Sequence, residues 1–198
     1  MRKVAKPIVA IVGRPNVGKS TFFNYIVGQK ISIVEDKPGV TRDRIYADAN
    51  WRGRDFTLVD TAGIEPKSDD IIISGMREQV EIAIDIADVI LFLTDIKQGV
   101  TEVDKDISLL LKKSKKPVVL VCNKSDGFGK VNEDIYEFYN LGIGDPFAVS
   151  SANATGIGDV LDEAYKYFPK EDKQDENSDI IKVALIRKAK CWKIFTCK

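Results

Sequence analysis

The sequence predicts an α/β domain with a mostly parallel β-sheet that is covered by helices on both faces. Two observations lead to this prediction. Short apolar runs, rich in β-branched residues as buried parallel strands are, occur at 7–12, 89–95 and 117–122. Segments with apolar residues three and four positions apart alternate with these runs, as in helices that pack one face on a sheet. Such sheets bind ligands at the carboxyl ends of their strands.

The composition is that of a globular protein without a dominant charge. Of the 198 residues, 44% are hydrophobic and 30% are charged, and 30 basic residues balance 30 acidic ones. A net charge of zero indicates no global field that attracts nucleic acid, and we expect no direct sequence-specific nucleic acid binding. The absence of histidine from the sequence excludes histidine catalysis and histidine metal ligation.

The cysteines and the N-terminal sequence favour a reducing compartment. Cys122, Cys191 and Cys197 are not spaced as metal ligands. The first six residues lack the apolar core of a signal peptide, and no apolar run is long enough to span a bilayer. We therefore expect a cytoplasmic monomer without membrane contact.

The first strand leads into the pattern glycine, four residues, glycine-lysine-serine at 13–20. A helix is expected at 21–27, ending at Gly28. This succession of strand, glycine loop and helix distinguishes a phosphate-binding loop from a chance match. Backbone N–H groups of such a loop converge on phosphate oxygens, and the positive helix end adds to the field. Lys19 is expected to reach the β and γ phosphates, and Ser20 to hold Mg²⁺.

The rest of the chain predicts a hairpin and further strand–helix units. Strands at 44–51 and 54–59 flank Arg52-Gly53, which is a hairpin signal. The Pro-Gly pair before them makes 37–43 a loop. Further elements are expected as helices at 70–87, 102–113, 132–140 and 157–168, and as a strand at 147–149.

The motif Asn-Lys-Ser-Asp at 123–126 follows a buried strand and predicts the choice of base. The Asp126 carboxylate would accept two hydrogen bonds from the ring N–H and the exocyclic amine of guanine. Adenine lacks this donor pair, so an ATPase is disfavoured. Asn123 is expected either to contact the base or to tie its loop to the phosphate loop, and the stem of Lys124 to cover the base.

The motif Asp-Thr-Ala-Gly at 60–63 predicts the remaining phosphate chemistry. Asp60 is expected to hold Mg²⁺ through water, and the N–H of Gly63 to contact the γ phosphate. Thr41, in the preceding loop, would close over Mg²⁺ and the γ phosphate only when that phosphate is present. The structural alternatives are a helix cap for Asp60 and an ordinary loop hydroxyl for Thr41; the ordered set of motifs favours the functional interpretation.

Together these segments resemble the translation-factor-related bacterial GTPases, and most closely the first GTPase domain of the Der (EngA) family of ribosome-assembly GTPases. The resemblance rests on GRPNVGKSTFFN, EDKPGVTRDR, DTAG, NKSD and SSANATGIGDVLD, and it covers residues 7–168. It implies a Ras-like P-loop fold, GTP or GDP with Mg²⁺ as ligands, and GTP hydrolysis coupled to assembly of the large ribosomal subunit. The nucleotide site that it implies consists of Gly13, Asn16, Val17, Gly18, Lys19, Ser20, Thr21, Asp60, Gly63, Asn123, Lys124, Asp126, Ser151 and Ala152, with Ser20, Thr41 and Asp60 on the metal.

Residue 64 departs from the Ras-like pattern. Ile64 stands where Ras-like enzymes carry a water-orienting glutamine, so hydrolysis should be slow or promoted differently. Related GTPases with asparagine at the position of Asn16 use K⁺ in place of an arginine finger, which makes K⁺ a candidate cofactor. Lys19, Thr41 and Asn16 are then the expected catalytic residues.

Several alternatives stay open. Arg42 or Arg44 is an alternative source of the activating charge. A guanine-nucleotide-dependent interaction module with negligible hydrolysis, which Ile64 favours, is the alternative function. A defective fragment that only binds nucleotide is a third.

The last thirty residues depart from the pattern of the domain. We expect a GTPase domain at 1–168, an acidic linker at 169–179, and at 180–186 the opening strand of a second GTPase domain. A phosphate loop should follow, but 187–198 contain none. Back-translated with permitted codons and read one base later, these residues give Gly-Lys-Pro-Asn-Val-Gly-Lys-Ser-Ser-Leu-Val, a second phosphate loop. We therefore expect a one-base frameshift after Ile186 and a tail without a selected fold.

Overall fold

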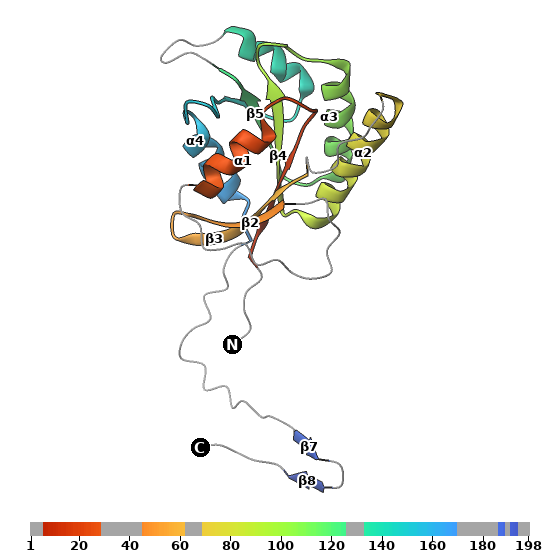
Figure 1. Ribbon diagram of the computed structural model, residues 1–198, viewed down its shortest axis with the longest axis vertical. Coiled ribbons are helices and arrows are strands. Elements are labelled where there is room, and N and C mark those ends of the chain that lie inside the picture. The colour runs from red at the N-terminus through yellow and green to blue at the C-terminus, as the bar shows by residue number, and fades with distance from the viewer. Residues whose placement is uncertain are drawn as a thin grey trace.

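The computed structural model describes residues 6–28, 45–61, 69–125, 133–169, 186–188 and 191–193. Within them, a six-stranded sheet has the order β2-β3-β1-β4-β5-β6 (Figure 1). β2 pairs antiparallel with β3, and the other neighbours pair in parallel, which confirms the predicted sheet. The strands are β1 (Ile8–Val12), β2 (Ile45–Trp51), β3 (Arg54–Asp60), β4 (Val89–Asp95), β5 (Val118–Asn123) and β6 (Pro146–Ala148).

Helices cover both faces of this sheet (Figure 1). α1 and α4 pack on one face, while α2, α3 and the 3₁₀ helix η1 pack on the other. No helix among the described residues is long and apolar enough to cross a membrane. The helices are α1 (Lys19–Gly28), α2 (Asp69–Ile86), α3 (Glu102–Ser114), η1 (Glu133–Leu141) and α4 (Ile157–Lys166).

The central strand β1 shows why the parallel strands have continuous apolar sequences. Val9 and Ile11 belong to the hydrophobic cluster under α1 and α4. Ala10 and Val12, whose side chains alternate with them, belong to the cluster under α2 and α3. Because both faces are covered, every position from Val9 to Val12 is buried.

The β2–β3 hairpin turns where the sequence predicts. Arg52 and Gly53 both have positive φ, at 50° and 82°, as the two central residues of a type I′ turn do. The tip is fastened to α4, because Trp51 Nε1 donates a hydrogen bond to Asp162 Oδ1 at 2.8 Å and Arg52 forms an ion pair with the same carboxylate.

Arg54, at the start of β3, contacts Phe168 and Pro169 after α4. The guanidinium of Arg54 lies 5.5 Å from the ring centroid of Phe168 and donates to the Pro169 carbonyl. The Phe168 ring packs 5.5 Å from that of Phe56, between centroids. The segment after α4 therefore packs against the sheet instead of leaving directly.

Three predicted elements differ from the structure in type or in bounds. The helix expected at 132–140 is a 3₁₀ helix, whose buried residues Phe138 and Leu141 stand three apart, as three residues per turn require. The strand expected at 147–149 is β6, one residue earlier, where it pairs with Leu120–Cys122 of β5. The helix expected at 157–168 ends at Lys166.

The tail contains a pairing that the sequence does not indicate. β7 (Ile186–Lys188) and β8 (Cys191–Lys193) pair antiparallel and form a sheet of their own. Isolated two-stranded ribbons are marginally stable in water. Of the strand expected at 180–186, only Ile186 is described, and the linker beyond Pro169 lies outside the described residues, so the domain boundaries and the frameshift stay predictions.

Candidate functional site

The loop between β1 and α1 is built around two close backbone approaches. Gly13 has φ 151°, and a Cβ there would lie 2.3 Å from the carbonyl oxygen of Leu93. Gly18 has φ 96°, and a Cβ there would lie 2.4 Å from Nδ2 of Asn123. A side chain at Gly13 would collide with the backbone of β4, and one at Gly18 with the side chain of Asn123 at the end of β5. Both positions of the motif therefore require glycine for steric reasons.

Lys19 opens α1 and points its amine back across this loop. Its Nζ donates hydrogen bonds to the carbonyl oxygens of Gly13 at 2.7 Å and Arg14 at 2.8 Å. Burial lowers the pKa of Lys19 to about 8, an effect that the nearby Asp60 carboxylate opposes. A phosphate bound in the loop would offer this buried amine an anionic partner in place of neutral carbonyls.

The oxygen atoms predicted to hold Mg²⁺ lie side by side. Ser20 Oγ donates to Oδ2 of Asp60 at 3.3 Å, and Asp60 is buried at the carboxyl end of β3. The neighbouring Thr61 hydroxyl donates to the Ile11 carbonyl at 2.7 Å and fastens the end of β3 to β1. A hydroxyl and a carboxylate are the hard oxygen ligands that Mg²⁺ prefers, so these residues fit that ion.

Among the described residues, the protein supplies few ligands to the predicted metal site. In the described part of the chain, no group of three or more acidic or cysteine side chains could hold a metal by itself. Phosphate oxygens and water molecules would complete an octahedral Mg²⁺ site here. Thr41, the third predicted ligand, and Gly63, the predicted γ-phosphate contact, lie outside the described residues.

Asn123, at the end of β5, joins three loops. Its side chain is 2% exposed, and Nδ2 donates to the Val17 carbonyl of the phosphate loop at 2.8 Å. Its Oδ1 accepts from Ser151 N at 3.0 Å and from Ser151 Oγ at 2.8 Å, in the loop before α4. Of the two roles left open for Asn123, the structure has the tie between loops.

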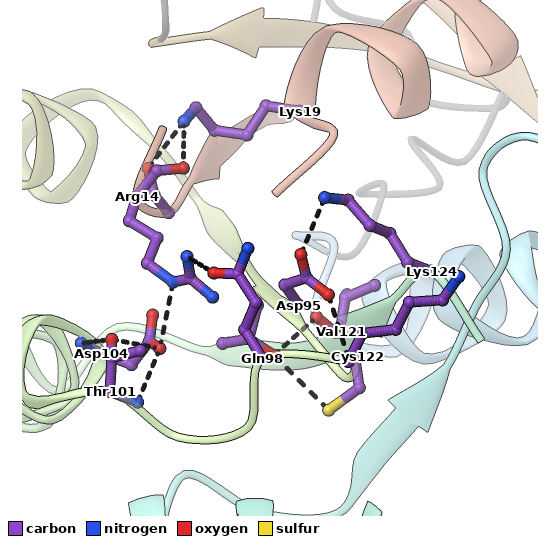
Figure 2. Close-up of polar contacts among 12 residues, drawn as sticks. Arg14, Lys19, Asp95, Gln98, Thr101, Asp104, Val121, Cys122 and Lys124 are labelled. Carbon is purple, nitrogen blue, oxygen red and sulfur yellow. Dashed lines mark hydrogen bonds and ion pairs between the residues drawn. The ribbon is translucent and has the colours of Figure 1, made fainter. Parts of the chain in front are cut away.

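Lys124 is held by a carboxylate that the sequence analysis does not include. Its backbone is left-handed, with φ 67°, and its Nζ forms an ion pair with Oδ2 of Asp95 at 2.7 Å (Figure 2). Asp95 is buried at the end of β4, and its Oδ1 accepts from the N–H of Lys97 at 3.0 Å. The ion pair fixes the direction in which the Lys124 stem runs.

These loops line a partly open pocket of about 190 Å³. Seven residues that the sequence indicates line it, including Ser150, which with Ser151 and Ala152 is expected to offer backbone N–H to the guanine oxygen. Lys97 lines it in addition. Asn16 is exposed, with φ 63°, and Asp126, which is expected to read the base, lies outside the described residues. The lining consists of Gly18, Thr21, Lys97, Asn123, Lys124, Ser150, Ser151 and Ala152.

Sequence reasoning missed three groups at the site: Asp95, Lys97 and the Arg14–Asp104 ion pair. Asp95 ends a fully buried parallel strand, which is where ligand-binding groups gather in such sheets, so its position was a usable signal. Arg14 and Asp104 are 90 residues apart, and no local pattern joins them.

The fold and the site define a P-loop GTPase domain. Residues 8–124 match the sequence profile of the 50S ribosome-binding GTPase family, and the chain belongs to this family. In particular, it is similar to the GTPase Der of Acetivibrio thermocellus, with 60% identity over 183 residues that cover 92% of this chain and 42% of that protein. The GTPase Der of Agathobacter rectalis is 58% identical over 185 residues, or 93% of this chain and 42% of that protein. The chain thus spans less than half the length of these relatives.

Solved structures agree with this assignment. Aquifex aeolicus Era bound to GDP·AlF₄⁻ has a TM-score of 0.66 and 33% identity, and the match covers 84% of this chain and 58% of Era. A second Era structure, in complex with MgGDPNP and a segment of 16S ribosomal RNA, has a TM-score of 0.64 and 31% identity over the same shares. These matches confirm the Ras-like P-loop fold that the sequence predicts.

Proposed function

We propose that this chain is a GTP-binding and GTP-hydrolysing switch domain of a factor that acts in assembly of the large ribosomal subunit. The observation that carries the proposal is the hydrogen bond from Asn123 Nδ2 to the Val17 carbonyl, at 2.8 Å. It joins the loop that is expected to select guanine to the loop that is expected to hold phosphates. The two halves of a guanine nucleotide would therefore be bound at a fixed separation.

In this proposal, each phosphate-binding group has a defined task. The Lys19 amine and the backbone N–H groups of the loop hold the β and γ phosphates, and Ser20 and Asp60 hold Mg²⁺. When bound, the ion neutralises charge that develops between the β and γ phosphates. Thr41 and the Gly63 N–H are expected to sense the γ phosphate.

Competition binding and phosphate release test the proposal. Fluorescent GDP should be displaced by GDP and GTP and far less by ADP and ATP. Phosphate release from GTP should require Mg²⁺ and fall on Lys19→Ala. A chain that binds guanine nucleotides without measurable phosphate release would instead support the interaction module, for which Ile64 is the argument. Equal binding of ATP and GTP would overturn the guanine assignment.

We further propose that K⁺ supplies the activating charge. The support is Asn16, which is exposed on the phosphate loop in a left-handed conformation. Hydrolysis should be faster in KCl than in NaCl at equal ionic strength. Asn16→Ala should abolish this difference and leave GDP affinity nearly intact. Equal wild-type rates in the two salts would contradict the role of K⁺ and leave Arg42 and Arg44 as the alternatives.

The ribosomal role is supported by the description of the family and by relatives that are known as GTPase Der. A ribosomal partner would place the protein in the cytoplasm. The domain should sediment with isolated large subunits in one nucleotide state and separate from them in the other. Comparison of a non-hydrolysable GTP analogue with GDP tests this, with small subunits as the control. Sedimentation that does not depend on the nucleotide would contradict a switch.

The boundaries of the domain are also a proposal: a GTPase domain to 168, a linker to 179, and an out-of-frame tail after Ile186. The support is the second phosphate loop that appears when the codons of 187–198 are read one base later. Sequencing the gene across codons 185–190 would test it. An unshifted frame with other codons would overturn this interpretation without affecting the nucleotide site.

A further inference from the structure

Arg14, in the phosphate loop, extends its side chain to a helix that has no assigned part in nucleotide binding. Its Nε donates to Asp104 Oδ2 at 3.3 Å, and its Nη1 donates to Gln98 Oε1 (Figure 2). Its own backbone carbonyl accepts from Lys19 Nζ at 2.8 Å. One residue therefore contacts the phosphate-binding amine through its backbone and the α3 region through its side chain.

Asp104 is a rigid anchor for this contact. Its side chain is fully buried, at 0% exposure, in the first turn of α3. Its Oδ2 also accepts from the backbone N–H of Thr101 at 3.1 Å and from the Thr101 hydroxyl at 2.7 Å, which closes the capping box of the helix. The two bonds from Thr101 tie Oδ2 to the start of α3, so the buried carboxylate stays with that helix and holds the loop relative to it.

The Arg14–Asp104 pair is poorly arranged for stability alone. Arg14 Nη2 and Asp104 Oδ1 are both buried and have no hydrogen-bond partner among the described residues. A pair arranged for maximal stability would join these two atoms in a bidentate contact. Buried ion pairs with unsatisfied atoms contribute little net stability relative to neutral replacements. The position of the guanidinium therefore calls for a reason other than stability.

We propose that Arg14 is a positioning residue for the phosphates: Asp104 and Gln98 hold its side chain, which fixes the loop backbone and so the Lys19 amine. The inference rests on the proposed nucleotide function. It assigns to the β4–α3 segment a role on both sides of the site. At its start Asp95 holds Lys124 on the base side, and at its end Asp104 holds Arg14 on the phosphate side.

Two ligands that differ only in phosphate test this role. Arg14→Met in the full chain should lower affinity for GDP about tenfold, because a displaced loop misaligns the phosphate contacts. Affinity for guanosine, measured by ligand-observed NMR, should not change. Asp104→Asn should act in the same direction, and Arg14→Lys, which keeps the charge but not the planar fork, should recover part of the loss.

A double variant separates positioning from folding. Arg14→Met combined with Asp104→Asn removes both charges and keeps an oxygen for the capping box, so its melting temperature should approach that of the wild type. The loss of GDP affinity should persist. Recovery of GDP affinity together with stability would overturn the proposal, because the pair would then be structural only.

Leu161→Ala is the control for general destabilisation. Leu161 is on the buried face of α4 and packs on the opposite side of the sheet from α3, so this variant should melt earlier. Well below its melting temperature it should bind GDP and guanosine as the wild type does. An Arg14→Met variant that binds GDP as tightly as the wild type overturns the inference alone. A wild-type chain that binds neither ligand overturns the nucleotide function and this inference with it.

Discussion

The base half and the phosphate half of the site are held in different ways. In the base half, the buried Asn123 side chain makes three hydrogen bonds of 2.8–3.0 Å to backbone and side-chain groups of two loops. In the phosphate half, the Lys19 amine donates to the carbonyl oxygens of Gly13 and Arg14, and Ser20 Oγ donates to Asp60 Oδ2 at 3.3 Å. In the described part of the base half, the protein's own groups tie the loops together, whereas a bound phosphate and ion would replace the contacts of Lys19 and of the Ser20–Asp60 pair. We therefore expect the Asn123 loop to stay fixed while the phosphate half responds to its ligand.

The largest expected effect tests the base half at Asp126, the residue that is expected to read the base. Asp126→Asn should lower GDP affinity at least about 30-fold, since losing one partner of a buried charged pair costs about 2–5 kcal/mol. Affinity for xanthosine diphosphate should rise, because the xanthine carbonyl accepts from the amide. Competition binding with both nucleotides measures the exchange. A variant that loses GDP without gaining the xanthine nucleotide would mean that Asp126 does not contact the base edge.

Asn123→Ala should weaken both halves at once. It leaves the Val17 carbonyl and the Ser151 N–H without partners, at about 1–3 kcal/mol for each buried group. Guanosine and GDP should therefore lose affinity by similar factors, which calorimetry and NMR can compare. Ser151→Ala is the matched control, because it removes only the hydroxyl bond of 2.8 Å and keeps the backbone bond. If Asn123→Ala lowered only GDP affinity, the loop tie would serve the phosphates and not the base.

A smaller effect is expected on the pH dependence of binding, which should differ between GDP and guanosine. Burial lowers the pKa of free Lys19 to about 8, and an anionic phosphate would raise it again. Between these two pKa values binding takes up a proton, so GDP affinity should fall by up to about tenfold per pH unit above pH 8 and stay level below it. Guanosine affinity should stay level from pH 7 to 9. Parallel pH profiles for the two ligands would show that Lys19 does not meet the phosphates.

The smallest effect is expected outside the site. Deleting residues 170–198 should leave GDP affinity and the melting temperature nearly unchanged, because β7 and β8 pair only with each other among the strands described. Amides beyond Pro169 should exchange rapidly with solvent in the intact chain. Strong protection there, or loss of GDP binding on deletion, would make the tail an integral element and contradict the frameshift proposal.

The residues that the sequence could place are those in short motifs directly after apolar strands. Contacts between residues far apart in the sequence could not be predicted. The phosphate loop, Asp60 and the Asn-Lys pair at 123–124 follow directly on apolar strands, so motif and topology together placed them. Asn123 had two possible roles, because the sequence cannot show that Val17 lies within reach. The Arg14–Asp104 pair depends on how α3 docks beside the phosphate loop, which no spacing encodes. The 3₁₀ form of η1, with Phe138 and Leu141 buried three positions apart, was not distinguished from an α-helix by the apolar pattern alone.

Strand β3 connects two distant parts of the domain in a single rod. It ends in Asp60, beside Ser20, and begins at Arg54, whose guanidinium holds Phe168 and the Pro169 carbonyl. Seven extended residues span about 20 Å, and ladder hydrogen bonds on both sides resist stretching. A shift of Asp60 along the strand would therefore reach Arg54, and through it the contacts with Phe168 and Pro169.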